Sequence, residues 1–152
     1  YNTGIEVVLS EKINSWYNLN LNINAYRNQI NAFTVRNLYP VPNTFSAAQD
    51  DIISGNVKLN QNFKFKNNFD AQLTATYLAR DIIPQGEIGA RFSLDLGLKK
   101  GFKNGKDELF FNGSDLLNTM VIQRDIRGLD FNYTSKDYYE TQVFRIGYTR
   151  KF

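Results

Sequence analysis

The sequence predicts an all-β fold in which about seven antiparallel strands run up and down one after another. The first observation behind this prediction is the stretch YNLNLNINAY, residues 17–26, in which apolar and amide side chains alternate. Successive side chains of a strand leave its opposite faces, so a period of two indicates a β-strand. The second observation is the composition, with 12 Phe and 9 Tyr but only 3 Pro in 152 residues. Such a composition favours strands.

A helix is the alternative for this first stretch. Residues at three- and four-residue steps, such as Leu19, Ile23 and Tyr26, would line one face of a helix. That helix would leave Leu21 and Ala25 off its apolar face. It would also place four Asn residues in a helix interior, where each costs about half a kcal/mol or more relative to Ala. The sequence therefore predicts a strand here.

The N-terminal half contains the first expected strands, which are residues 4–11, 16–33 and 54–65. The turn-forming residues Asn14 and Ser15 separate the first two strands. Residues 34–51 are polar and hold two of the three prolines, so a long loop is expected before the third strand.

The C-terminal half contains the remaining expected strands, which are residues 69–78, residues 88–102, a strand that starts at residue 108, and residues 139–152. Lys-Asn-Asn at residues 66–68 turns the chain into the first of these, and a Pro-Gly loop at residues 79–86 precedes the next. The Asn-Gly pair within residues 103–106 is the strongest short signal for a hairpin. The strand after it is irregular over residues 112–118 and is expected to resume near residue 120, and an extended loop region is expected at residues 128–137.

Short and long connections alternate along this expected meander. The short ones are residues 12–15, 66–68 and 103–106, and the longer ones are residues 34–51, 79–86 and 128–137. In an up-and-down sheet, all short turns then fall at one end and all longer loops at the other. Transmembrane β-barrels of the outer membrane show this asymmetry, with tight periplasmic turns and longer outside loops.

A soluble, lipocalin-like barrel that carries a ligand is the alternative, because it shows the same alternation with its faces reversed. Strands of about ten residues favour the membrane barrel, since they can cross a bilayer when tilted. Aromatic residues at the short-turn end also favour it, because membrane barrels have aromatic girdles at their interfaces. These residues are Trp16, Tyr17, Phe63, Phe65, Phe69, Phe102, Phe110, Phe111, Tyr148 and Phe152.

The membrane interpretation assigns a role to each face of the strands. The expected lipid-facing residues are Leu19, Leu21, Ile23, Leu59, Leu73, Phe92, Leu94 and Leu96. The expected lumen-facing residues are Asn18, Asn20, Asn22, Asn24, Asn56, Lys58, Asn60, Asn62, Arg91 and Asp95, with Ser93 between the last two. A narrow barrel must fill its interior with side chains, whereas a wide lumen can leave neutral amides solvated.

Other functional classes find little support. The chain has no His and no Cys, so the usual general base of a hydrolase and any thiolate metal site are missing, and we expect neither an enzyme nor a cofactor. The carboxylates at residues 50–51, 107–108 and 115 lack the spacing of a calcium loop and are expected to be solvated. Residues 101–106 join two strands, which excludes a phosphate-binding loop before a helix. The net charge of +3 comes from scattered Lys and Arg, so we expect no nucleic-acid partner.

The last nine residues, FRIGYTRKF, resemble the terminal β-signal that the barrel assembly machinery reads in outer-membrane proteins. Arg145, Gly147 and Phe152 stand at the polar, glycine and terminal aromatic positions of that signal. Arg150 stands where the signal has an aromatic residue, and Tyr148, on the same face, substitutes for it. The resemblance implies that the last strand binds the assembly machinery.

The region from residue 105 onwards looks like the closing strands of TonB-dependent receptors and their barrel relatives. It has a strand carrying DLLN at residues 115–118, a loop, and Tyr139-Glu140 leading into the final strand. The resemblance implies a barrel of about 22 strands, a size that encloses a plugged lumen. It also implies TonB-dependent uptake of a bulky nutrient such as a metal chelate, a glycan or a peptide. A passive or purely structural barrel is the alternative.

The same resemblance implies that residues 1–152 are the C-terminal part of the barrel domain. The chain begins at Tyr1 without a leader, and its expected number of strands is odd, whereas closed bacterial barrels of one chain have an even number. A plug and a coupling box would then lie upstream. The partners it implies are the rest of the barrel and the lipid of the cell outer membrane, with TonB and a surface lipoprotein as further partners.

Overall fold

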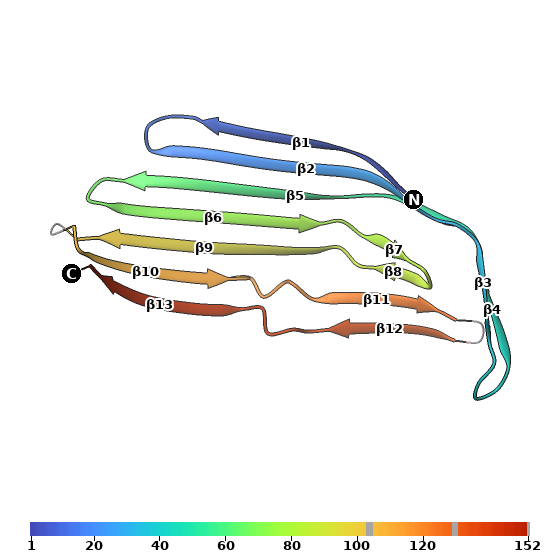
Figure 1. Cartoon of the computed structure of the whole chain (residues 1–152). Helices are drawn as coiled ribbons and strands as arrows, with labels where there is room; N and C mark the ends of the chain where they lie inside the picture. Colours follow the sequence, from blue (N-terminus) through green and yellow to red (C-terminus); the bar gives the residue numbers. More distant parts are fainter. Residues whose placement is uncertain (103–104, 129–130, 152) are drawn as a thin grey trace.

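The computed structural model describes residues 1–102, 105–128 and 131–151, and it confirms the predicted meander. Seven strands form one sheet in the order β1-β2-β5-β6-β9-β10-β13, and all neighbours pair antiparallel (Figure 1). These strands are β1 Asn2–Lys12, β2 Tyr17–Ile30, β5 Asp50–Phe65, β6 Phe69–Leu78, β9 Arg91–Gly101, β10 Asp107–Ser114 and β13 Val143–Arg150. In the described part of the chain β1 and β13 do not pair with each other, so this sheet is open and forms no closed barrel.

The longer connections are not loops, and this part of the prediction is wrong. They contain β3 Phe33–Asn37, β4 Asn43–Ala47, β7 Asp81–Ile83, β8 Gly86–Ile88, β11 Ile122–Arg127 and β12 Asn132–Asp137. β3 and β4 form a separate hairpin, and the other four form a sheet in the order β12-β11-β8-β7. Solvent reaches both faces of β3 and β4 at most positions, so their pairing needs no alternation of apolar and polar residues. The alternation pattern therefore could not predict these two strands.

Several strand boundaries also differ from the prediction. The second strand ends at Ile30 rather than at residue 33, and the third begins at Asp50 rather than at residue 54. The strand expected from residue 88 begins at Arg91, because Ile88 belongs to β8 and pairs with Arg124. The strand expected to resume near residue 120 instead forms β11 in the smaller sheet. The last strand begins at Val143 rather than at residue 139.

The short connections lie together at one end of the large sheet, as predicted (Figure 1). In the first turn, the Asn14 side chain accepts hydrogen bonds from the backbone N–H groups of Trp16 and Tyr17, at 3.0 and 2.9 Å. In the second turn, Asn67 and Asn68 adopt positive φ angles of 62° and 54°, which Asn tolerates better than most residues. Residues 103–104 of the Asn-Gly hairpin lie outside the described residues, but β9 and β10 pair as that signal predicts.

The large sheet forms a single layer that buries very few apolar side chains (Figure 1). Among the described residues, Ile82 is the one large hydrophobic residue that is buried, at 5% exposure. Ile5, Phe144 and Ile146 are 73%, 57% and 75% exposed. The described residues contain no helix of the length and apolarity needed to span a membrane.

Candidate functional site

The register of the large sheet brings the predicted lipid-facing residues onto one face. Residues that pair across antiparallel strands project from the same face. Leu21 lies opposite Leu9 and Leu59, and Leu73 lies opposite Leu96. All the predicted lipid-facing residues share this side, which we call the apolar face: Leu19, Leu21, Ile23, Leu59, Leu73, Phe92, Leu94 and Leu96.

Charged residues bound the apolar face at both ends. At the end with the long connections, Arg27 and Asp51 form an ion pair with 2.8 Å between Nη2 and Oδ2. At the short-turn end, the boundary residues are Glu11, Lys100, Asp107 and Arg150. From Tyr17 to Ala25, β2 rises about 27 Å, or about 21 Å at a strand tilt of about 40°. This height is close to the apolar band of about 25 Å that membrane barrels present to lipid.

Stacked aromatic rings occupy the short-turn end of the apolar face. Tyr17 and Phe63 stack with centroids 4.9 Å apart, Trp16 lies 6.2 Å from Phe63, and Phe65 lies 5.7 Å from Phe69. The predicted gathering of aromatic residues is confirmed for these five. Phe110 also lies near the short-turn end, but it lies opposite Lys99 and Gly147 on the other face and therefore does not join these rings. Phe152 lies outside the described residues.

The predicted lumen-facing residues share the opposite side of the sheet, which we call the polar face: Asn18, Asn20, Asn22, Asn24, Asn56, Lys58, Asn60, Asn62, Arg91 and Asp95. The amides lie in cross-strand pairs, with Asn20 opposite Asn60 and Asn24 opposite Asn56. The register establishes the two faces, and the medium that each face contacts stays a prediction.

Two residues of the polar face differ from expectation. Ser93 is only 8% exposed, because its small side chain lies between those of Arg91 and Asp95 and beside Thr76. Asp95 does not simply face solvent, since its Oδ1 accepts a hydrogen bond of 2.8 Å from the backbone N–H of Asp115.

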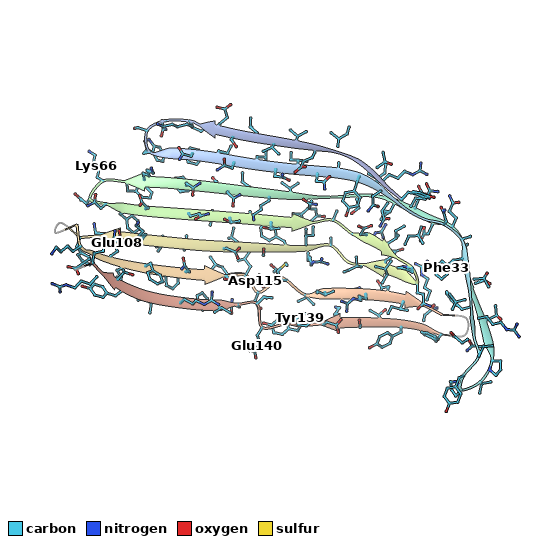
Figure 2. The ribbon with its side chains drawn as sticks, in the orientation of Figure 1. Phe33, Lys66, Glu108, Asp115, Tyr139 and Glu140 are labelled. Carbon is cyan, nitrogen blue, oxygen red and sulfur yellow. The ribbon has the colours of Figure 1, made fainter. Side chains whose placement is uncertain are left out.

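Asp115 was expected to be a solvated loop carboxylate, and the structure contradicts this. Its side chain is 2% exposed at the point where β10 ends (Figure 2). The carboxylate accepts hydrogen bonds from the backbone N–H groups of Thr119 and Met120, at 3.0 and 3.2 Å, and from the Thr141 hydroxyl at 2.6 Å. Asp115 thus joins the end of β10 to the segment that leads into β13.

The backbone of the DLLN segment, residues 115–118, is shaped to make this junction. Asp115 and Asn118 adopt positive φ angles of 44° and 55°. The backbone N–H of Leu116 donates to the carbonyl of Leu94, and the Gln142 side chain donates to the carbonyl of Leu116, at 2.8 and 3.0 Å. The motif therefore ends the sixth strand of the large sheet and directs the chain into the smaller sheet.

Asp115 lies level with the middle of the apolar face, because the adjacent Leu116 bonds to Leu94, which lies in line with Leu59 and Leu21. A buried carboxylate needs hydrogen-bond donors to offset its lost hydration. The backbone N–H groups of Thr119 and Met120 and the Thr141 hydroxyl supply these donors.

Gly147 of the predicted assembly signal makes room for an aromatic ring. A Cβ added at Gly147 would lie 2.1 Å from Cζ of Phe110, which pairs with Gly147 across β10 and β13. The ring of Phe110 therefore lies over the glycine on the polar face. This contact fixes the position of the last strand beside β10.

Replacing Gly147 by alanine is expected to destabilise the protein by about 1–3 kcal/mol, because the new methyl group must displace the Phe110 ring. Urea-induced unfolding of the full-length protein in lipid vesicles measures the loss. The double variant Gly147→Ala with Phe110→Leu should regain part of it, and Thr149→Ala on the same face is the control. A Gly147→Ala variant as stable as the control would contradict this account.

The remaining signal residues divide between the two faces. Arg145 lies opposite Asn112 on the polar face, and Tyr148 lies opposite Leu109 on the apolar face. The Tyr148 hydroxyl donates a hydrogen bond to Asp107, which also pairs with Arg150. In the part of the chain that the structure describes, no group of three or more acidic side chains is arranged to hold a metal ion.

The comparison with protein families gives one match for this chain. A sequence model of the outer membrane protein beta-barrel family matches residues 1–149. The comparison with curated proteins gives no match, and neither does the comparison with solved structures. The family match covers both faces of the large sheet and all the hairpins described above.

Proposed function

The chain belongs to the outer membrane protein beta-barrel family, and on this premise we propose that it forms wall and lumen lining of a transporter for TonB-dependent uptake of a bulky nutrient. Membership of the family implies a location in the outer membrane of Gram-negative bacteria, and it decides against the soluble ligand carrier. The observation that carries the proposal is the separation of the large sheet into an apolar and a polar face.

The apolar face supports contact with lipid. Its side chains, such as Ile5 and Ile146 at 73% and 75% exposure, would be unfavourable in water at about 25 cal/mol per Å² of apolar surface. No second layer of the described structure covers them. The ion pair of Arg27 with Asp51 supports a membrane boundary near the last residues of β2.

The two edges of the sheet support a larger barrel. β1 and β13 each have one unpaired edge in the described part of the chain. In hydrocarbon each unsatisfied backbone group costs several kcal/mol, so membrane sheets close into barrels. We propose that further strands of the same protein pair with these edges, in a barrel of about 22 strands with a plug.

The polar face supports a wide, water-filled lumen. Within the described residues, no side-chain hydrogen bond involves Asn18, Asn24, Asn56 or Asn62, although all four are only partly exposed. Asn is disfavoured in strands, so this concentration of amides does not serve strand stability. In a lumen the amides would bind water and passing solutes without imposing a fixed charge.

Growth experiments with a deletion strain test the transport function. The strain is grown with a ferric chelate as its iron source, an oligosaccharide as its carbon source or a peptide as its nitrogen source. Loss of growth on one nutrient, reproduced by deleting TonB, is the expected result. If the deletion lowers only the passive permeation of small solutes, the chain belongs to a passive barrel instead. If it affects only the integrity of the cell envelope, the barrel is structural.

Deleting Phe152 from the full-length protein should strongly lower its amount in the outer membrane, with accumulation and degradation in the periplasm. The reason is that the proposed assembly signal sets the register of the last strand by main-chain pairing and alternate side chains. Quantitative blotting of outer-membrane fractions measures this. Phe152→Tyr keeps the terminal ring and is the control; unchanged abundance of the deletion variant would remove the assembly machinery as a partner of this residue.

A further inference from the structure

A hollow of about 490 Å³ lies among three connections at the long-connection end of the structure. It is lined by the end of β2, the junction of β4 and β5, the β7–β8 turn and the end of β11. We call it the outer cleft, and the lining residues that matter here are Ile30, Phe45, Asp50, Ile83, Glu87 and Arg127. Its volume falls in the range of about 300–1,000 Å³ typical of ligand sites.

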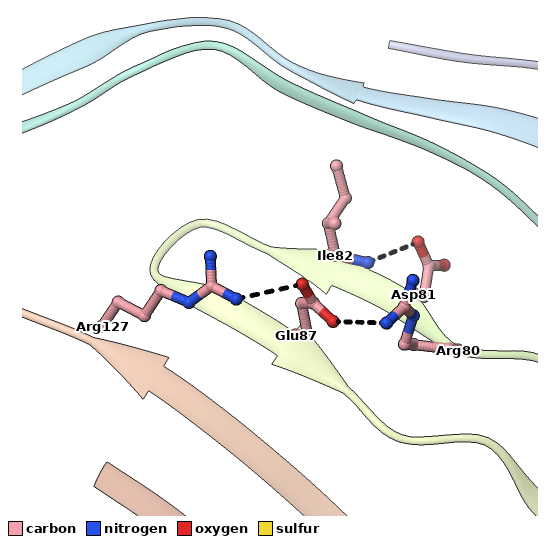
Figure 3. Close-up of polar contacts among 5 residues, drawn as sticks. All are labelled: Arg80, Asp81, Ile82, Glu87 and Arg127. Atoms are coloured by element: carbon pink, nitrogen blue, oxygen red, sulfur yellow. Dashed lines mark hydrogen bonds and ion pairs between the residues drawn. The ribbon is translucent and has the colours of Figure 1, made fainter. Parts of the chain in front are cut away.

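One wall of the outer cleft presents a guanidinium group. Glu87 lies between Arg127 and Arg80, with Nη2 of Arg127 3.3 Å from Oε1 and Nη1 of Arg80 3.2 Å from Oε2 (Figure 3). The side chain of Arg127 is 69% exposed, whereas that of Glu87 is only 23% exposed. Because a guanidinium has five N–H donors, Arg127 can hold a second carboxylate while it keeps Glu87.

Another wall presents a carboxylate. Asp50 begins β5, pairs in register with Ile30, and is exposed. Among the described residues, Asp50 has neither an ion pair nor a side-chain hydrogen bond. The outer cleft therefore combines an available anion and an available cation, with the apolar side chains of Ile30, Phe45 and Ile83 along the same hollow.

We propose that the outer cleft binds a short peptide with free termini. Arg127 binds its terminal carboxylate, Asp50 binds its terminal ammonium group, and an apolar side chain packs on Phe45 and Ile83. This inference rests on the proposed function, because it selects one of the nutrient classes and places the long connections outside the cell.

Charge separates the peptide from the other two nutrient classes. A neutral oligosaccharide has no ionic partner for Asp50 or Arg127. An anionic metal chelate would match Arg127 but would be repelled by Asp50 and Glu87. A zwitterionic peptide complements both walls, and its side chains account for the apolar lining.

Calorimetric titration of the full-length protein, purified from outer membranes in detergent, tests this inference with trileucine as the probe. Asp50→Asn and Arg127→Gln are each expected to weaken trileucine binding at least about tenfold. Trileucine that is acetylated at its N-terminus and amidated at its C-terminus should bind the unmodified protein as weakly as free trileucine binds these two variants. Lys136→Gln, an exposed change on β12 outside the outer cleft, is the matched control and should leave binding unchanged.

Several results would overturn the inference. The first is that trileucine does not bind to protein that migrates as a folded barrel. The second is that Asp50→Asn and Arg127→Gln bind trileucine as tightly as the unmodified protein does. The third is that maltotriose or ferric citrate binds more tightly than trileucine. TonB-dependent uptake of a glycan without trileucine binding would overturn the outer cleft but not the transport function. Trileucine binding that depends on Asp50 and Arg127, in a protein whose deletion affects no uptake, would support the outer cleft and overturn the transport function.

Discussion

Replacing Leu21 by arginine is expected to cost about 2–4 kcal/mol of folding free energy, or to abolish membrane insertion, while arginine at the adjacent Asn20 is tolerated. Leu21 lies in the middle of β2 on the apolar face, between Leu9 and Leu59. An arginine at the bilayer midplane of a barrel costs about this much on the lipid side. Asn20 lies on the polar face, opposite Ser10 and Asn60, and in the proposed barrel an arginine there would extend into the lumen.

The pair of variants is well matched, because both residues are half-buried neighbours in one strand. Urea-induced unfolding of the full-length protein in lipid vesicles gives the free-energy difference, and the outer-membrane fraction gives the effect on insertion. Ser93 and Leu94 are a poorer pair, since Ser93 is 8% exposed and arginine there would be crowded on either interpretation. Equal damage from Leu21→Arg and Asn20→Arg would contradict the assignment of the apolar face to lipid.

The large sheet could be predicted from the sequence because its two faces differ in chemistry. Residues 69–78 were expected as a strand, and β6 has the same bounds. The alternation of apolar and polar residues predicted which side chains share a face of the sheet. Turn residues such as Asn67 and Asn68 predicted where a strand ends. The family match agrees with the kind of barrel that these two signals indicated.

The smaller strands could not be predicted because no face of them is systematically apolar. β3 and β4 pair through their backbones and through polar contacts such as Thr34 with Ser46, at 3.0 Å between hydroxyl oxygens. The outer cleft was missed for a related reason. Asp50, Glu87 and Arg127 come from three separate connections, and only the fold brings them together.

The burial of Asp115 could not be predicted from the sequence, although Asp115 opens the DLLN motif. A lone Asp in a polar turn is typical of a solvated carboxylate, whereas Asp115 is 2% exposed. An Asp that starts a turn commonly accepts hydrogen bonds from backbone N–H groups a few residues later. The N–H groups of Thr119 and Met120 do this here, but the bond from Thr141 crosses to a distant segment and leaves no local pattern.

Replacing Asp115 by alanine is expected to destabilise the folded protein by on the order of 3 kcal/mol. The substitution leaves three buried or part-buried donors without their acceptor, and each such loss costs about 1–3 kcal/mol. Leu117→Ala is the matched control, because Leu117 belongs to the same motif and is 55% exposed. Its effect should stay within about 0.5 kcal/mol.

Replacing Asp115 by asparagine distinguishes the carboxylate acceptor from mere packing. Asparagine has nearly the same shape, but its NH2 group cannot accept the two hydrogen bonds that Oδ2 of Asp115 receives from the Met120 N–H and the Thr141 hydroxyl. Asp115→Asn is therefore expected to lose at least about 1 kcal/mol of stability in urea unfolding in vesicles, with Leu117→Ala again as the control. An Asp115→Asn variant as stable as the unmodified protein would show that shape, and not the carboxylate, holds β10 to the segment before β13.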